Sequence, residues 1–467
     1  MAKLKHMSST PSRYRLLVLP LTALFIYFLF SIVSLLRQGQ YASTEDPVSR
    51  YQLPQETLER EFYSWEKSDS IIPEKTYKPA PEPGIPVSDP FPLLSRNPPP
   101  KRSLLQAPKI SRPPRRHYPE QTPLFIGFTR NWPQLLQCVV SYIAAGWPPE
   151  DIYVIENTGV MHANRDGRLT LQNPFYLNHT QLAMLGVRVI ITPTLLTFSQ
   201  LQNFYLWTAL SLNYPYFFWS HQDVLVFSNE TTTASSPSSL YSNAVRTLRY
   251  LLSPAAPRWA HHFFAYDHLT LVHRDAVLAA GAWDTHIAYY ASDCDMYVRL
   301  MLAGYWQGES EAGIILDVAS VMEDVGALLR IPGVRARLPG DNDYYDGEEE
   351  GEYGGREWID KHGETWERLL QLGYRMEREK YHGGNGHRNT WQRRQRGGQG
   401  EPFYRDPDGF EQGVKMFIDT GRSVFAEKWG HRGCDIAKAG IRPEDAWRLE
   451  RDWDPENEGL GYQGGSW

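Results

Sequence analysis

From position 124 onward, short apolar runs alternate with stretches of helical periodicity. The run LFIGFTR, which starts at Leu124, predicts a buried strand. Asn131-Trp132-Pro133 follows and predicts the start of a helix, with Asn131 as N-cap and Pro133 in the first turn. Apolar residues then recur at helical spacing to about Gly146. This segment is therefore expected to form a strand followed by a helix.

The same alternation continues for about 200 residues. We expect strands over 151–155, 187–191, 216–219 and 313–317, and helices over 199–212 and 358–380. Strands that alternate with helices predict an α/β fold with a mostly parallel sheet, which binds its ligands at the carboxyl ends of the strands. Polar residues follow three of these strands: Thr129, Arg130 and Asn131; Glu156 and Asn157; and His221, Gln222 and Asp223.

The N-terminal part contains one uncharged apolar run, residues 16–36, close to the ~20 residues that cross a bilayer. Four basic residues precede it and only Arg37 follows closely, which predicts a cytosolic N-terminus. A cleaved signal peptide is the alternative, but the run is long for one and no small-x-small site follows it. We expect a cytosolic tail (1–15), a transmembrane signal anchor (16–36) and a lumenal remainder, in a single-pass type II protein of the Golgi or ER–Golgi membrane.

The region between this run and the first strand is rich in proline. Fifteen of the 34 prolines fall between positions 73 and 123, which predicts an extended stem over 37–123. The globular domain is expected over 124–434, with an acidic insert near 341–355 and a Gly/Arg-rich insert near 383–400, followed by a tail over 435–467.

Composition narrows the function only slightly. The net charge of -6 gives no basic footprint for nucleic acid. The three cysteines, Cys138, Cys294 and Cys434, leave open which two pair, if any do. Two N-glycosylation signals, at Asn178 and Asn229, agree with a lumenal location.

Three segments together resemble a known family. They are TRNWPQLLQCVVSYIAAGWPPEDIYVIENTG, YFFWSHQDVLVF and GAWDTHIAYYASDCDMYVRLMLAGY. In this order they are similar to the motifs of glycosyltransferase family 2 domains, which have the GT-A fold of nucleotide-diphospho-sugar transferases. The resemblance covers about 180 residues. It implies a transfer that inverts the anomeric carbon and a divalent cation, Mn²⁺ or Mg²⁺, that assists the leaving group.

The resemblance assigns the cation to the segment after the fourth strand. Asp223 is the expected ligand, because a cation held by carboxylate oxygens neutralises a diphosphate. His221 stands where the family has a carboxylate, and it is a second candidate ligand. His431, in a late Lys-Trp-Gly-His element, is a third, with Lys428 as a rival that contacts the phosphates.

The third motif carries the expected catalytic acids. Asp293 corresponds to the general base that takes the proton of the acceptor hydroxyl. Asp295 is expected to orient the site or bind the acceptor, although both acids could simply cap a helix. Ser292 replaces the usual acid of the family. Trp283 and Asp284 are expected at the acceptor site because sugars stack on aromatic faces, with a core tryptophan as the alternative.

The donor is expected at the ends of the first two strands. The candidate donor contacts are Thr129, Arg130, Asn131, Glu156, Asn157 and Lys428. Together these observations predict a hexosyl- or N-acetylhexosaminyltransferase that takes a nucleotide sugar as donor and a glycan or glycoconjugate as acceptor. A complex with other glycosyltransferases is a further expected partnership.

Two alternatives remain open at this stage. A catalytically silent relative that binds glycans or acts as a scaffold would explain the departures at His221 and Ser292. A lumenal metal hydrolase would use histidines such as His261, His262, His268 and His273, although no metal-ligand spacing accompanies them.

Overall fold

The computed structural model describes residues 74–113, 120–230, 237–341, 356–382 and 395–454. The chain divides into two compact units, Met1–Lys78 and Pro79–Trp467, and of the first only residues 74–78 are described. The expected anchor over 16–36, most of the acidic insert and residues 383–394 of the second insert lie outside the described residues. Within the described ranges, no helix combines the length and the apolar character needed to cross a membrane.

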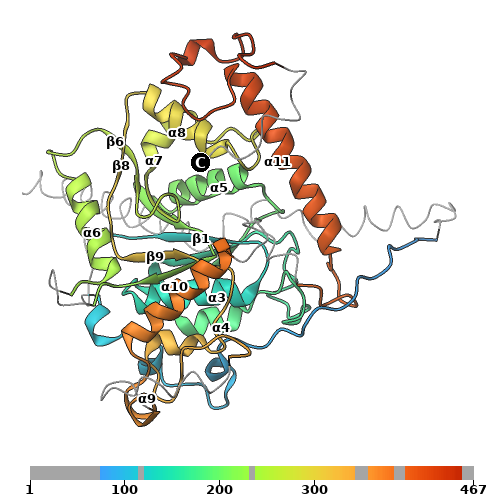
Figure 1. Cartoon of the computed structure of the whole chain (residues 1–467), viewed down its shortest axis with the longest axis vertical. Helices are drawn as coiled ribbons and strands as arrows, with labels where there is room; N and C mark the ends of the chain where they lie inside the picture. The colour runs from blue at the N-terminus through green and yellow to red at the C-terminus, as the bar shows by residue number, and fades with distance from the viewer. Residues whose placement is uncertain (1–73, 114–119, 231–236, 342–355, 383–394, 455–467) are drawn as a thin grey trace, which may run out of the picture. The chain divides into compact units, whose positions relative to one another are not determined.

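A seven-stranded mixed sheet forms the centre of the second unit (Figure 1). Its strands, in spatial order, are β3 (Arg188–Ile191), β2 (Ile152–Glu156), β1 (Leu124–Phe128), β4 (Tyr216–Ser220), β7 (Leu269–His273), β6 (Trp259–Phe263) and β8 (Trp306–Glu309). The pairs β3–β2, β2–β1, β1–β4 and β6–β8 are parallel, whereas β7 runs antiparallel to both of its neighbours. This mostly parallel α/β arrangement is consistent with the expected GT-A-like fold.

A smaller sheet and the helices complete the unit. β5 (Val224–Phe227) pairs antiparallel with β9 (Ile314–Asp317) in a separate two-stranded sheet. The α-helices are α3 (Trp132–Ala144), α4 (His179–Leu185), α5 (Phe198–Ser211), α6 (Leu240–Leu251), α7 (Arg274–Ala279), α8 (Ser292–Leu302), α9 (Arg356–His362), α10 (Trp366–His382) and α11 (Pro407–Trp429). The 3-10 helices are η2 (Pro92–Ser95), η3 (Arg102–Leu105), η4 (Lys109–Ser111), η5 (Pro149–Asp151), η6 (Val325–Leu329) and η9 (Pro443–Asp445).

Alternation along β1 separates two hydrophobic cores. Leu124 and Ile126 face a core that includes α3, α4, α6 and α10, while Phe125 faces a core that includes α5, α7 and α8. Figure 1 shows α5, α7 and α8 on one side of the sheet and α3, α4 and α10 on the other. The predicted N-cap is confirmed, since the Asn131 side chain accepts a hydrogen bond from the Gln134 backbone N–H. The strand–helix pattern of the sequence thus produced a three-layer domain.

The stem boundary is placed earlier than the sequence suggested. The globular unit begins at Pro79, and Phe91, Leu94 and Leu105 are buried in the larger core. These three apolar side chains are embedded among prolines, which hide the periodicity of a helix or strand but do not prevent side chains from packing. The C-terminal boundary shifts as well, because Ile436 and Ile441 lie in a core with α8 and α11.

A disulfide joins Cys294 on α8 to Cys434, and Cys138 is a buried free thiol. The sequence had left this pairing open. The link closes a separation of 140 residues and ties the segment after α11 to the helix that begins with Ser292 and Asp293.

We expect reduction of this disulfide to lower the free energy of unfolding by about 2–4 kcal/mol, because a long closed loop restricts the unfolded chain. The measurement is urea unfolding of the full-length chain with and without reductant. In the Cys434→Ser variant reductant should have no effect, whereas Cys138→Ala should keep the full response to reductant. Equal stability of oxidised and reduced wild-type protein would contradict this expectation.

Candidate functional site

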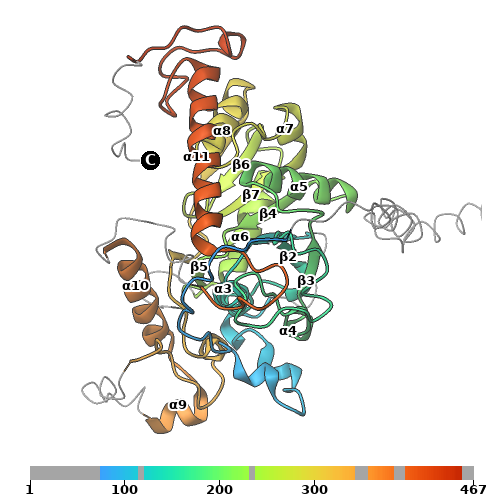
Figure 2. The ribbon, with the colours of Figure 1, turned by 90° about the vertical axis from the view of Figure 1, so that its right-hand side faces the viewer.

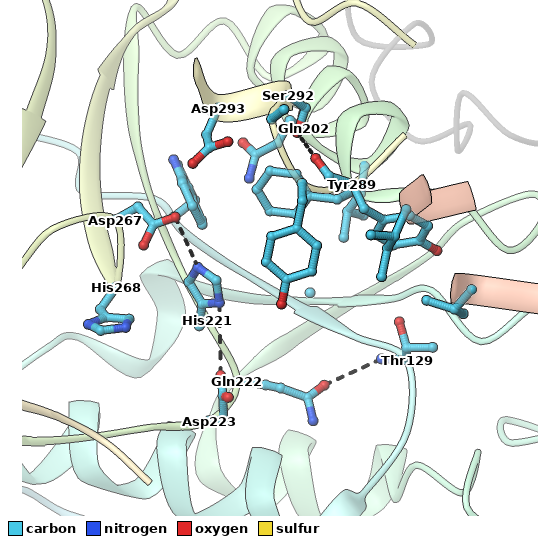
Figure 3. A pocket seen from close by; sticks show the side chains of 18 of the residues that line it. Thr129, Gln202, His221, Gln222, Asp223, Asp267, His268, Tyr289, Ser292 and Asp293 are labelled. Carbon is cyan, nitrogen blue, oxygen red and sulfur yellow. Dashed lines mark hydrogen bonds and ion pairs between the residues drawn. The ribbon is translucent and has the colours of Figure 1, made fainter. Parts of the chain in front are cut away.

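A pocket of about 870 Å³ opens where the central strands end (Figure 3). Thr129 and Arg130 follow β1, and residues 221–223 follow β4, so the carboxyl ends of two adjacent parallel strands line it. The chain places β2 and β3 on one side of β1 and then crosses to place β4 on the other side. Open α/β sheets bind ligands at such a switch point, here between β1 and β4. Gln222 bridges the two strand ends by accepting from the Thr129 N–H (3.4 Å) and donating to the Arg130 carbonyl (2.8 Å).

The antiparallel strand β7 adds two residues that the sequence did not assign to this site. Because β7 runs opposite to β4, the residues before it, Asp267 and His268, lie beside the end of β4. The His221 N–H donates to the His268 carbonyl (3.4 Å), and His221 Nε2 lies 3.6 Å from an Asp267 carboxylate oxygen. The sequence signal for this placement is an acid, Asp267, just before a strand. It could be used only if the antiparallel pairing of β7 with β4 were already known.

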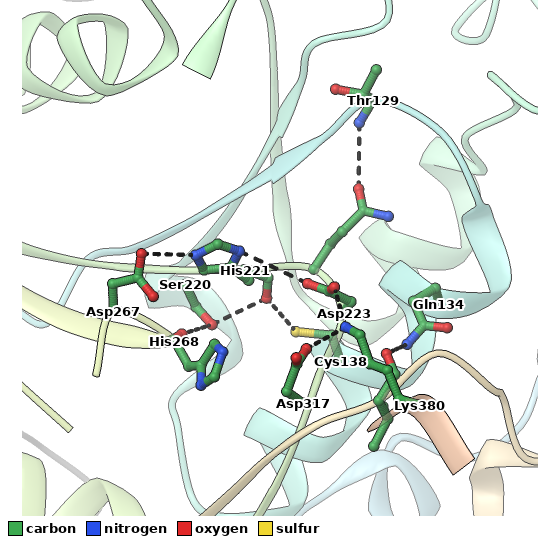
Figure 4. A network of polar contacts seen from close by, with 12 residues as sticks. Thr129, Gln134, Cys138, Ser220, His221, Asp223, Asp267, His268, Asp317 and Lys380 are labelled. Carbon is green, nitrogen blue, oxygen red and sulfur yellow. Dashed lines mark hydrogen bonds and ion pairs between the residues drawn. The ribbon is translucent and has the colours of Figure 1, made fainter. Parts of the chain in front are cut away.

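The β5–β9 pair brings a third carboxylate close to Asp223. Val224 pairs with Asp317, and the Val318 N–H donates to the Asp223 carbonyl (2.9 Å). Between the two carboxylates lies the ammonium of Lys380, from the last turn of α10 (Figure 4). Lys380 Nζ is 2.8 Å from Asp223 Oδ2 and also bonds to Asp317 Oδ1. The sequence identified the strand that ends in Asp317 and the helix that contains Lys380, but it did not predict that these two residues contact each other.

His221 lies between Asp267 and Asp223, and these acids change its pKa. Burial alone would lower its pKa, but Asp267 first, then Asp223 and Asp317, raise the pKa of His221 to about 9. Burial likewise opposes ionisation of Asp223, yet Lys380 and His221 outweigh it and lower the pKa of Asp223. Acidic and basic side chains therefore alternate along a linked row made of Asp267, His221, Asp223, Lys380 and Asp317.

Asp293 lines the same pocket on the side away from Asp223 (Figure 3). It lies in the first turn of α8, which begins after Ala291 in a left-handed conformation with φ of 73°. Burial, and then the charge of Asp267, raise the pKa of Asp293, while the Cys294 N–H and the Tyr266 hydroxyl at 3.1 Å partly oppose the rise. A carboxylate with a raised pKa, aimed into a pocket, has the character of a general base.

Helix α11, which the sequence had not predicted, forms another wall of the pocket. Figure 2 shows it running from beside α8 past the strand ends. Its lining residues include Phe410, Glu411, Lys415 and Arg422, and Glu411 pairs with Arg130 at 2.7 Å. Arg130 is thus in the expected place but is engaged by an acid of the protein itself. Asn131 does not line the pocket, since it caps α3 and accepts from Gln395.

Two expected donor contacts, Glu156 and Asn157, are buried away from this pocket. Glu156 accepts from Asn164 (2.8 Å) and lies 2.7 Å from His179 Nε2. The Asn157 side chain bonds to the backbone N–H and carbonyl of Leu196. Neither lines the pocket, and both hold the connections that follow β2.

Of four further candidates outside the pocket, three form a polar cluster, namely Lys428, Asp284 and Asp295, and the fourth, Trp283, packs in a hydrophobic core. Lys428 Nζ lies 2.7 Å from both Asp284 and Asp295, and Asp295 also accepts from Arg299 (2.8 Å) and Trp429 Nε1 (3.1 Å). Asp295 is fully buried, and Trp283 packs in the core against Phe198 and Tyr297. None of these side chains lines the pocket, so their geometry suits a structural role that joins α8 to α11.

The described residues do not fit the expected divalent cation. No group of three or more His, Cys, Asp or Glu side chains among them is arranged to hold a metal. Asp223 and Asp317 are already joined by Lys380, and His431 bonds to Asp435 and Asp452 rather than lining the pocket. The Lys380 ammonium therefore already occupies the position between Asp223 Oδ2 and Asp317 Oδ1 that a bridging cation would need.

Comparisons with known proteins leave the family open. No family model and no curated protein matches the chain. Among solved structures, a mannosyltransferase from Pyrobaculum calidifontis in complex with GDP-Man and Mn²⁺ matches with 12% identity and a TM-score of 0.28 over 45% of this chain and 60% of that one. A cytidylyltransferase from Leptospira borgpetersenii matches with 11% identity and a TM-score of 0.25 over 41% of this chain and 76% of that one. Scores this low carry no argument about function.

The remaining candidates, except His268, lie outside the pocket. His261 and His262 are buried in β6, and burial lowers their pKa values to about 3 and about 4, so both are neutral. His273 caps α7 by accepting from the Ala276 N–H. Of these histidines only His268 lines the pocket, which gives no support to the hydrolase alternative. Asn178 caps α4, and Asn229 forms a β-bridge with Ser238.

Proposed function

We propose that this protein is a glycosyltransferase that moves a sugar from a nucleotide-diphosphate donor to a hydroxyl of a glycan or glycoconjugate. The observation that carries the proposal is the pocket at the switch point of the sheet, which has Asp223 after β4 on one side and Asp293 at the start of α8 on the other. These are the acids to which the resemblance to family 2 glycosyltransferases assigns the cation and the general base. Its volume suits a ligand of nucleotide-sugar size.

In the proposed reaction Asp293 acts as the base. Its carboxylate takes the proton of the acceptor hydroxyl, whose oxygen bonds to the anomeric carbon as the bond from that carbon to the diphosphate oxygen breaks. Attack from the face opposite the leaving group inverts the anomeric centre. The nucleoside diphosphate leaves from the side of the pocket formed by the ends of β1 and β4. We place Thr129, Gln222 and Arg130 at the donor because they surround that side.

The compartment is part of the proposal. The apolar run over 16–36 and the disulfide between Cys294 and Cys434 both suit a single-pass protein with its catalytic unit in the oxidising lumen of the secretory pathway. The sugar type, hexose or N-acetylhexosamine, stays open within this proposal.

A screen of UDP-, GDP- and dTDP-sugars tests it directly. Binding of a donor to the folded chain should raise the melting temperature with occupancy, and release of nucleoside diphosphate should follow when a glycan acceptor is added. A full-length chain that neither binds nor turns over any of these donors would refute the enzyme proposal. It would favour the alternative of a silent glycan-binding or scaffold protein, which the pairing of Asp223 and Asp317 with Lys380 also suits.

A further inference from the structure

Lys380 places its ammonium between the two carboxylates Asp223 and Asp317 in this pocket. Its side chain is only 3% exposed, and its ammonium joins Asp223, which precedes β5, to Asp317, which ends β9. Two buried carboxylates this close repel each other strongly in a low dielectric. Lys380 removes that repulsion, and the two acids in turn raise the pKa of Lys380 despite its burial.

The surrounding contacts fix this arrangement from several sides. The second carboxylate oxygen of Asp317 accepts from the Tyr381 hydroxyl (2.7 Å), and the Asp317 N–H donates to Glu377 (3.4 Å). Both partners lie on α10 with Lys380, so three residues of one helix hold the end of β9. The Asp223 oxygen that does not face Lys380 lies 3.9 Å from His221. The Lys380 ammonium therefore fills the space between Asp223 Oδ2 and Asp317 Oδ1 in which a bridging metal ion would lie.

We infer that the Lys380 ammonium takes the place of a divalent cation in this pocket and competes with such a cation for Asp223 and Asp317. An ammonium has three N–H donors, of which the two aspartates use two, so one remains for a diphosphate oxygen. Lys380 lines the pocket and is therefore placed to contact a donor. The contact of Lys380 with a donor diphosphate rests on the proposed function. The competition between Lys380 and a divalent cation for Asp223 and Asp317 does not depend on it. Wild-type protein accordingly binds its donor without a divalent cation.

The first test measures Mn²⁺ binding to the full-length chain by electron paramagnetic resonance. Wild-type protein should show no Mn²⁺ site that depends on Asp223. Lys380→Met removes the ammonium between the two carboxylates and should create an Mn²⁺ site that binds at least roughly tenfold more tightly than any Mn²⁺ site of wild type, and adding Asp223→Asn should abolish it. Lys361→Met is the control, because Lys361 is an exposed lysine of α9 outside the pocket, and it should leave Mn²⁺ affinity unchanged.

Stability gives a second measurement. Removing one partner of a buried ion pair destabilises the fold, so Lys380→Met should melt at a lower temperature than wild type, and Mn²⁺ should recover part of the loss. Mn²⁺ should not change the melting temperature of wild-type protein. If Lys380→Met does not fold, the wild-type measurements still decide: Mn²⁺ binding to wild type that disappears in Asp223→Asn would overturn the inference.

The donor experiment separates this inference from the proposed function. Donor binding that is equally strong in EDTA and in Mn²⁺ supports the replacement of a metal by Lys380, and binding that requires Mn²⁺ overturns it. If no nucleotide sugar binds under either condition, the proposed function fails. The Mn²⁺ affinities of wild type and Lys380→Met then still test the competition.

Discussion

The Asp293→Asn variant is expected to lose about 10²- to 10⁴-fold in kcat, because the amide cannot take the proton of the acceptor hydroxyl. The donor affinity should change little, since Asp293 lies on the side of the pocket away from the ends of β1 and β4. The measurement is the rate of nucleoside diphosphate release with acceptor, together with the melting-temperature shift caused by donor. A large loss of donor affinity with unchanged kcat would contradict the role of a base.

The pH dependence gives an independent check of the same role. Burial and Asp267 raise the pKa of Asp293, and a base acts only when it is deprotonated. The rate should therefore fall on acidification at a pH above the range in which an ordinary aspartate titrates. Asp275→Asn serves as the control, because Asp275 is an exposed acid on α7 outside the pocket and pairs only with its neighbour Arg274 among the contacts of the described residues. Its rate and pH profile should match those of wild type.

Asp295→Ala should cost about 3–5 kcal/mol of unfolding free energy, because it leaves two buried cations without their shared carboxylate. Asp295 accepts from Arg299 and Trp429 and pairs with Lys428, and it has no exposed surface. Urea unfolding measures the effect. Asp166→Ala, which removes an exposed partner of Arg165, should cost less than about 1 kcal/mol.

A double-mutant cycle separates structure from catalysis at Asp295. Removing Lys428 as well, in Asp295→Ala/Lys428→Met, should cost less than the sum of the two single changes, because each charge is costly mainly when the other is missing. A variant at Asp295 that keeps wild-type stability but loses kcat would restore the catalytic role that the sequence suggested. Asp293 and Asp295 are two residues apart on α8, so their side chains point to different faces of the helix.

Local signals were sufficient for the first half of the domain. The apolar run from Leu124, the Asn131 cap and the alternation along the chain predicted β1, α3 and a mostly parallel sheet, because burial and capping act between near neighbours in sequence. α11 was missed although Phe410, Val414 and Ile418 recur at helical spacing, because three glycines interrupt the segment and glycine disfavours a helix. Its central turns are also largely exposed, as Met416 and Phe417 illustrate. The packing of Phe91 was missed because single apolar residues among prolines resemble a linker.

The site was predicted unevenly for a similar reason. A residue at the end of a predicted parallel strand, such as Thr129 or Asp223, can be placed in a pocket from sequence, because parallel strands end at one edge. Glu156 also ends such a strand, yet its side chain turns into a buried network with His179 and Asn164. Which way a side chain turns depends on partners that are distant in the chain, and the sequence does not supply them.

The sequence by itself determined the order of β1, α3, β2, β3, α5 and β4, the acids at the strand ends and the acid pair of α8, because each follows from short-range pattern and spacing. Only the tertiary structure decided which acid of that pair faces the pocket, that Cys294 pairs with Cys434, and that Lys380 joins Asp223 to Asp317. Lys380 is 157 residues from Asp223, and contacts over such distances exist only once both sheets and α10 have packed. The charge of the pocket, and with it the choice between an ammonium and a metal ion, is therefore a property of the fold.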